Sequence, residues 1–158
     1  MSKNDPENTL VMETSKGSIL IALRPDLAPA HVARIKQLAA EGFYDGLVFH
    51  RVIDGFMAQG GDPTGTGMGG SGQKLKAEFS KEPHVRGVCS MARSNDPNSA
   101  DSQFFICLDE APWLNGQYTV WGEVIEGLEV ADAFERGEPV DNPDKITTMR
   151  VLADVKAA

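Results

Sequence analysis

The chain is built from short apolar runs separated by turn-forming residues, and the clearest example spans residues 49–62. Two apolar runs in this stretch are split by the pair Asp54-Gly55. An Asp-Gly step between apolar runs is a strong hairpin signal, because glycine adopts positive φ without a steric penalty. The pattern predicts a strand, a tight turn and a second strand, so that Arg51 and Gln59 become near neighbours.

Other short apolar runs, and an alternating stretch at the C-terminal end, also predict strands. Together with the hairpin, the expected strands cover residues 9–13, 18–23, 49–53, 56–58, 87–91, 103–108, 119–124 and 146–155. Apolar residues recur at helical spacing in two further places. The first helix is expected to start near Pro29 and to stop near Gly42, and the second to cover residues 128–136.

The expected strands follow one another in runs and do not alternate with helices, which disfavours a parallel doubly wound sheet. Many short strands with turn-rich connections are typical of an antiparallel barrel, which also removes exposed sheet edges. The sequence therefore predicts a mainly β fold with about eight strands and two helices. We expect residues 1–8 to form a flexible leader and residues 9–158 a single domain.

Charge and composition exclude several classes of partner. The net charge of the 158 residues is −8, which argues against nucleic acid and anionic membranes because phosphate binding requires clustered Lys and Arg. No apolar run is long enough to span a membrane, and the polar N-terminus lacks the apolar core of a signal peptide. The expected location is the cytoplasm, or the periplasm only if a signal was trimmed. A monomer is expected.

The residues that commonly carry covalent or metal chemistry are poorly placed for it. Cys89 and Cys107 lie within separate apolar runs and are expected to be buried free thiols. The three histidines lack metal-ligand spacing: His50 is expected to be a hydrogen-bonded structural residue, His31 to face solvent, and His84 to lie in a loop. No activated serine accompanies them.

A glycine-rich loop follows the hairpin across residues 62–74. Residues 65–70 match a dinucleotide-binding pattern by letter, but no helix start follows them. The loop is therefore expected to border a cleft, because glycine allows the backbone to approach a ligand closely.

Arg51 is unusual because it is set within an apolar run. Such an arginine is either a surface residue with a buried stem or the polar centre of an apolar pocket. Phe104 and Phe105 are adjacent, so they must face opposite sides of a strand and one must be covered outside the barrel. Several more apolar residues lie in turns or at strand ends, namely Phe56, Met57, Trp113 and Leu114. An apolar cleft with one Arg and one Gln is typical of a binding site.

Three stretches of the chain, residues 49–62, 102–106 and 113–116, resemble the signature of cyclophilin-type peptidyl-prolyl cis-trans isomerases, here the short bacterial branch. The resemblance spans residues 9–155 in order. It implies a closed eight-stranded antiparallel β-barrel capped by two α-helices, with the site on its outer face. It also implies an enzyme that acts on Xaa-Pro bonds without cofactor or metal.

The resemblance further implies roles for individual residues. Arg51 would be the central catalytic residue, and Gln59 would support it and contact the substrate backbone. The proline ring would be held by a group of apolar residues: Phe56, Met57, Phe105 and Leu114. The rest of the groove would be formed by Gln103, Trp113, Tyr118, Gly67 and the backbone of Ala92, Arg93 and Ser94.

The chain departs from many relatives at two places: Tyr118 stands where they carry His, and Arg93-Ser94 stands where they carry Asn-Ala. These differences affect the expected substrate preference and the affinity for cyclosporin, a family inhibitor. The expected partners are proline-containing peptides and folding proteins. The alternative function is a proline-peptide binding or chaperone module without catalysis, although such a module has no reason to place Arg51 in an apolar cleft.

Overall fold

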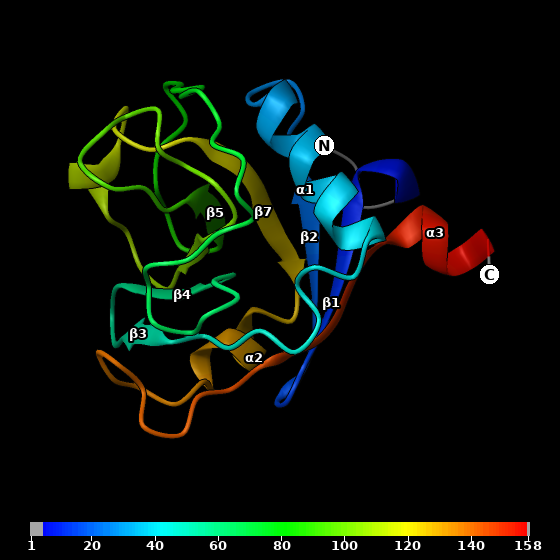
Figure 1. Ribbon diagram of the computed structural model, residues 1–158, viewed down its shortest axis with the longest axis vertical. Coiled ribbons are helices and arrows are strands. Elements are labelled where there is room, and N and C mark those ends of the chain that lie inside the picture. Colours follow the sequence, from blue (N-terminus) through cyan, green and yellow to red (C-terminus); the bar gives the residue numbers. More distant parts are fainter. Residues whose placement is uncertain (1–4, 158) are drawn as a thin grey trace.

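The computed structural model describes residues 5–157, and its main feature is one curled antiparallel sheet of eight strands (Figure 1). The strand order is β3-β4-β6-β5-β7-β2-β1-β8. The strands are β1 (Thr9–Thr14), β2 (Gly17–Leu23), β3 (Arg51–Ile53), β4 (Met57–Gly60), β5 (Val88–Met91), β6 (Phe104–Cys107), β7 (Val120–Glu126) and β8 (Ile146–Val151). The mainly β, eight-stranded antiparallel prediction is confirmed.

The barrel is less completely closed than expected. Among residues 5–157, β3 and β8 occupy the two ends of the strand order and do not pair as strands. An isolated bridge between Val48 and Lys145 joins the chain beside them. The sheet is therefore a curled, nearly closed barrel, and the free edge of β3 is covered by a loop through Gly137.

Alternation along each strand separates an inner face from an outer face. On the inner face, Leu10 lies opposite Ile21 and Met12 opposite Ile19, and all four side chains are fully buried. Helix α1 (Pro29–Ala40) contributes Val32, Ile35 and Leu38 to the same inner core, because these residues recur on one side of the helix. This inner core supports the curvature of the sheet.

The second predicted helix is shorter than its pattern suggests. Helix α2 (Leu128–Asp132) stops well before Arg136. The backbone N–H of Glu135 donates to the carboxylate of Asp144, and the Arg136 guanidinium donates to the carbonyl of Phe134. These contacts replace the hydrogen bonds that would have continued the helix.

The C-terminal prediction of one strand over residues 146–155 is wrong in its second half. β8 ends at Val151 and helix α3 (Leu152–Ala157) follows it, close to β1 (Figure 1). Within the expected leader, Pro6–Asn8 forms a short 3-10 helix, η1, that contacts α3. The rest of that prediction, for residues 1–4, lies outside the described residues. A second 3-10 helix, η2, covers Pro112–Leu114.

None of the helices in the described part of the chain is long and apolar enough to cross a membrane. The two cysteines are free and buried, as expected. Burial raises the pKa of the Cys107 thiol to about 12, so this group stays protonated and unreactive in the folded protein.

Candidate active site

The hairpin of β3 and β4 places Arg51 directly opposite Gln59. Their side chains share the outer face of the sheet, while Val52 and Ala58, one position along, enter the inner core. The Nη1 of Arg51 donates to the Oε1 of Gln59 at 3.3 Å. The tight turn at Gly55, whose φ is +70°, makes this pairing possible.

A directed chain of hydrogen bonds leads away from Arg51. Because arginine can only donate, the carbonyl oxygen of Gln59 must face it, and the Gln59 amide nitrogen then donates to Gln103 Oε1 at 2.9 Å. The amide nitrogen of Gln103 donates in turn to the backbone oxygens of Gly67 and Gly69, both at 2.9 Å. The glycine-rich loop thereby fixes the orientation of both glutamines.

An apolar cavity of about 140 Å³ lies beside Arg51. The sheet has a second, smaller hydrophobic cluster on this outer face, in which Phe105 is buried while Phe104 enters the inner core, as their adjacency predicted. The cavity is lined by Arg51, Phe56, Met57, Gln59, Ala92, Arg93, Phe105, Leu114 and Tyr118. An apolar pocket with a cation at its wall is suited to a small ring that carries a polar backbone.

The wall of this cavity is supported from behind by His84. Its ring stacks on Phe105 with centroids 6.2 Å apart and lies edge-on to Tyr118 at 6.5 Å. His84 is buried, with Nε2 at 3.0 Å from the Ser90 hydroxyl and Nδ1 at 3.2 Å from Asn115 Oδ1. Although these three side chains resemble a triad, Ser90 is fully buried and donates to the Thr119 carbonyl, so it is not available as a nucleophile.

A second cavity of about 310 Å³ adjoins the first and shares Gln59, Ala92 and Arg93 with it. The residues that line only this second cavity are Gly67, Met68, Gly69, Gly70, Lys74, Ser94, Ser99, Asp101 and Gln103. The glycine-rich loop thus borders a cleft, as the sequence predicted. Arg93 lines both cavities, and its guanidinium lies 4.7 Å from the centre of the Tyr118 ring.

The structure brings the predicted site residues together, with two qualifications. Trp113 lines neither cavity but lies at the outer margin, 63% exposed, with its ring 5.6 Å from that of Phe56. The backbone N–H groups of Ala92 and Ser94 already donate, to Gln103 O and to Ser99 Oγ. A substrate can therefore use those two N–H groups only by displacing an internal partner.

One of the predictions for histidine is wrong, and another holds only in part. His31 does not face solvent but is fully buried, because Glu78 reaches across from a distant loop to accept from its Nδ1 at 2.7 Å and from two backbone N–H groups of α1. His50 is buried, which suits the structural role predicted for it, but its Nδ1 has no hydrogen-bond partner among the described residues. Burial lowers the pKa of His50, which keeps it neutral near pH 7.

Residues that could hold a metal ion do not cluster within residues 5–157. Sequence reasoning missed Lys74 and Asp101 in the second cavity, and it missed Glu138, whose Oε1 accepts from Arg51 Nε at 3.0 Å. Glu138 is exposed and lies 87 positions from Arg51, so no local pattern could have revealed it.

Comparison with known sequences places the chain in the same family that its motifs resemble. The family model described as cyclophilin type peptidyl-prolyl cis-trans isomerase/CLD matches residues 9–154. A probable peptidyl-prolyl cis-trans isomerase of Brucella suis is 51% identical, with 98% of this chain and 88% of the relative covered. Peptidyl-prolyl cis-trans isomerase B of Bacillus subtilis is 49% identical, with 73% and 82% covered.

Solved structures agree with the sequence relatives. A cyclophilin from Hirschia baltica is similar with a TM-score of 0.88 and 34% identity, covering 95% of this chain and 76% of that one. A cyclophilin type peptidyl-prolyl cis-trans isomerase from Cryptosporidium parvum, crystallised in the presence of the dipeptide Ala-Pro, has a TM-score of 0.84 and 31% identity, covering 90% and 98%.

Proposed function

The chain belongs to the cyclophilin-type peptidyl-prolyl cis-trans isomerases, and on this premise we propose that it rotates Xaa-Pro bonds by a non-covalent mechanism centred on Arg51. The protein is an isomerase of the EC 5.2.1.8 type. One observation carries the proposed mechanism: the Arg51 guanidinium stands at the wall of an apolar cavity and is held there by Gln59.

The chemistry requires no bond to be broken. Resonance gives the prolyl C–N bond partial double-bond character, which sets a rotation barrier of about 20 kcal/mol. In the twisted transition state the nitrogen lone pair is no longer delocalised and can accept a hydrogen bond. A guanidinium donor beside that nitrogen binds the twisted state more strongly than either planar state, which is the requirement for catalysis.

The apolar cavity supplies the second part of the mechanism. Phe56, Met57, Phe105 and Leu114 would hold the proline ring, so that rotation takes place on one side of the bond only. The apolar walls lower the local dielectric and strengthen the contribution of Arg51. An acceleration of about 10⁵–10⁶ corresponds to about 7–8 kcal/mol, which one charged donor together with positioning can supply.

The larger cavity is the proposed site for the residues before proline. Gln59 and Gln103 would contact the substrate backbone at the junction of the two cavities, and Arg93, Ser94 and Gly67 would border the upstream side chains. Trp113 and Tyr118 would form the rim. The proposed substrates are proline-containing segments of folding proteins, and cyclosporin is a proposed ligand of the same groove.

Removal of the Arg51 guanidinium tests the mechanism. Arg51→Ala is expected to lose roughly a hundredfold or more of turnover, because one preorganised donor to the transition state is removed. Cis-trans exchange of a short Xaa-Pro peptide, measured by NMR, gives the rate, and chemical shift changes give the dissociation constant.

Arg86→Ala is the matched control, since Arg86 is also paired with a carboxylate, that of Asp132, but lines neither cavity. Turnover of Arg51→Ala within about threefold of wild type would refute the role given to Arg51. If the wild-type protein bound the peptide without accelerating its exchange, the binding-module function would be the correct one.

A further inference from the structure

A loop of ten residues, 135–144, runs along the edge of β3, on the side away from β4, and is called the strap below. Its backbone is joined to the catalytic hairpin and to the residues just before it by four hydrogen bonds, one of them from the N–H of Phe49 to the carbonyl of Asp144 at 2.8 Å. Val52 and Gly137 exchange two of them, both 2.9 Å long, and the N–H of Val140 donates to the carbonyl of His50 at 2.9 Å. The strap therefore occupies the position of a further strand beside Arg51.

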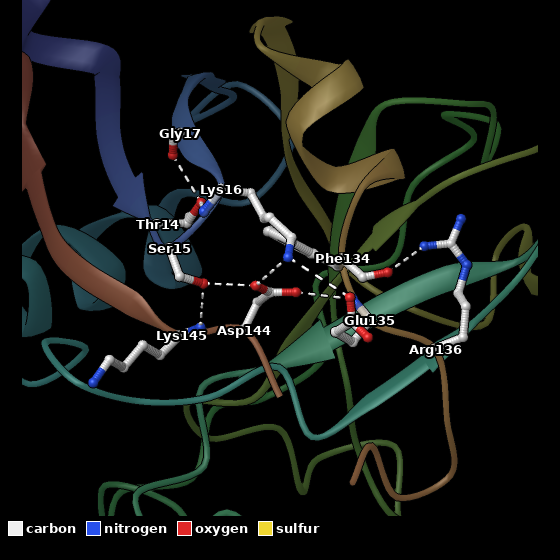
Figure 2. Close-up of polar contacts among 9 residues, drawn as sticks. All are labelled: Thr14, Ser15, Lys16, Gly17, Phe134, Glu135, Arg136, Asp144 and Lys145. Carbon is white, nitrogen blue, oxygen red and sulfur yellow. Dashed lines mark hydrogen bonds and ion pairs between the residues drawn. The ribbon is translucent and has the colours of Figure 1, made fainter. Parts of the chain in front are cut away.

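The two ends of the strap are tied together by Asp144 (Figure 2). One oxygen of this carboxylate accepts the N–H of Glu135 at 2.8 Å. The other accepts the Ser15 hydroxyl at 2.7 Å and lies 3.4 Å from Lys16 Nζ, both in the turn between β1 and β2. Asp144 is only 6% exposed, so the base of the strap is fixed to the body of the protein. The strap is a compact loop with closed ends.

The fixed strap presents Glu138 to Arg51. Glu138 Oε1 accepts from Arg51 Nε at 3.0 Å, while Gln59 Oε1 accepts from Nη1 at 3.3 Å. A guanidinium has five N–H donors, so two are committed to the protein and three remain for a substrate. The Arg51 side chain is 41% exposed, so its direction depends on these two contacts more than on close packing.

Building on the mechanism proposed above, we propose that Glu138 is a positioning residue for the isomerisation. Its carboxylate fixes the Arg51 guanidinium at a second point, which selects the rotamer that directs the remaining donors into the apolar cavity. A free arginine side chain distributes its donors over many rotamers, and preorganisation removes this cost before the transition state is reached. An ion pair between two exposed side chains contributes little to the free energy of unfolding. Removal of Glu138 should therefore lower the turnover and leave the stability of the fold nearly unchanged.

The test uses Glu138→Ala and Glu138→Gln in the full chain. Glu138→Ala is expected to reduce kcat roughly three- to tenfold, because the transition state alone depends on the direction of the donors. The dissociation constant of the peptide should stay within about twofold, since the apolar cavity binds the ring. Glu138→Gln keeps an acceptor oxygen, so it should recover most of the loss.

Asp54→Asn is the matched control. It removes the other ion pair between the strap and the hairpin, Asp54 with Arg136 at 3.1 Å, and leaves the contacts of Arg51 intact. Asparagine is also accepted in the turn before Gly55. Exchange rates of this variant should match the wild type, and thermal midpoints of all variants should be compared to confirm that they fold.

Two further measurements separate a positioning role from a structural one. In Glu138→Ala, ¹⁵N relaxation of the Arg51 Nε–H should report increased mobility on the nanosecond scale. In an Arg51→Ala background, Glu138→Ala should cause no further loss of exchange.

Three outcomes would overturn the proposal: full kcat in Glu138→Ala, an equal loss in Asp54→Asn, or the same loss in the absence of Arg51. If Arg51→Ala were itself fully active, the mechanism would fail. If Arg51→Ala were inactive while Glu138→Ala kept full kcat, only the role of Glu138 would fail.

Discussion

Two carboxylates order the loop that walls the larger cavity, and each does so through backbone N–H groups. Asp62, only 1% exposed, accepts from the N–H groups of Thr64, Thr66 and Gly67 and from the Thr64 hydroxyl. Asp101 accepts from the N–H groups of Ser71 and Gly72 at the other end of the loop. A glycine-rich segment has little intrinsic order, so its shape as a cavity wall depends on these acceptors.

Acid should weaken the loop through Asp62. Burial opposes ionisation of this group, but hydrogen bonds from Thr64, Gly69 and Gly67 outweigh it and lower its pKa to about 2. Because the folded pKa lies below the ordinary value, the stabilisation is complete above about pH 4 and is lost as the pH falls toward 2. Its size is about 2 kcal/mol.

Asp62→Asn isolates this contribution from that of other carboxylates. The free energy of unfolding is measured with urea at pH 6 and at pH 3 for both proteins. Its decrease from pH 6 to pH 3 should be smaller in the variant than in the wild type, because the variant has no carboxylate at position 62 to protonate. Equal acid sensitivity of the two proteins would show that Asp62 does not order the loop through its charge. Asp96→Asn, an exposed carboxylate outside both cavities, is the control.

At the scale of elements, the 3-10 helix η2 determines the outer margin of the site. Its three residues divide between two environments: Leu114 is 8% exposed and lines the apolar cavity, whereas Trp113 is 63% exposed beside Phe56. A short helix with one apolar residue inward and one outward leaves an aromatic surface that a longer substrate can cover.

Tryptophan fluorescence should report occupancy of this margin. The chain has two tryptophans, and Trp121 is fully buried in the inner core. Titration with a proline-containing peptide should therefore change the emission of Trp113 alone. Trp113→Phe should abolish the change and weaken binding roughly two- to fivefold, since part of the aromatic contact remains. Trp121→Phe should retain the change; a signal that survives Trp113→Phe would place the peptide elsewhere.

Features that depend on neighbours in sequence could be predicted, and features that depend on distant partners could not. The pairing of Arg51 with Gln59 follows from the turn at Gly55, and the opposite directions of Phe104 and Phe105 follow from strand geometry. The burial of His31 depends on Glu78, 47 positions away, which no periodicity encodes.

The same distinction explains why the strand predicted over residues 146–155 is wrong in its second half. The alternating pattern through Val151 and Val155 suits a strand, but Leu152 and Val155 also have helical spacing, and the chain there packs as α3 against η1 and β1. The sequence of this segment is compatible with both a strand and a helix, and the tertiary contacts determine that it forms a helix. At the candidate site, the residues that line the apolar cavity could be predicted from the motif resemblance. The contact of Glu138 with Arg51 could be found only from the three-dimensional structure.

At the scale of the whole molecule, the inner core and the outer cluster share their strands. In β6, the side chains of Phe104 and Ile106 lie in the inner core, and those of Phe105 and Cys107 lie in the outer cluster. In the neighbouring strand β4, Ala58 lies in the inner core and Met57 in the outer cluster. The site therefore cannot be separated from the barrel without removing a strand from the sheet. We expect the two clusters to unfold as one cooperative unit, in which the enzyme site has the stability of the core.

The two buried thiols provide a test of this cooperativity, because Cys89 belongs to the inner core and Cys107 to the outer cluster. Single-thiol variants, Cys89→Ala and Cys107→Ala, report one thiol each when a thiol reagent is added under native conditions. If the clusters open together, both thiols should react with the same dependence on urea as global unfolding. Should Cys107 react roughly tenfold faster than Cys89 at low urea, the outer cluster opens by itself, and the site is a separate, less stable layer on the barrel.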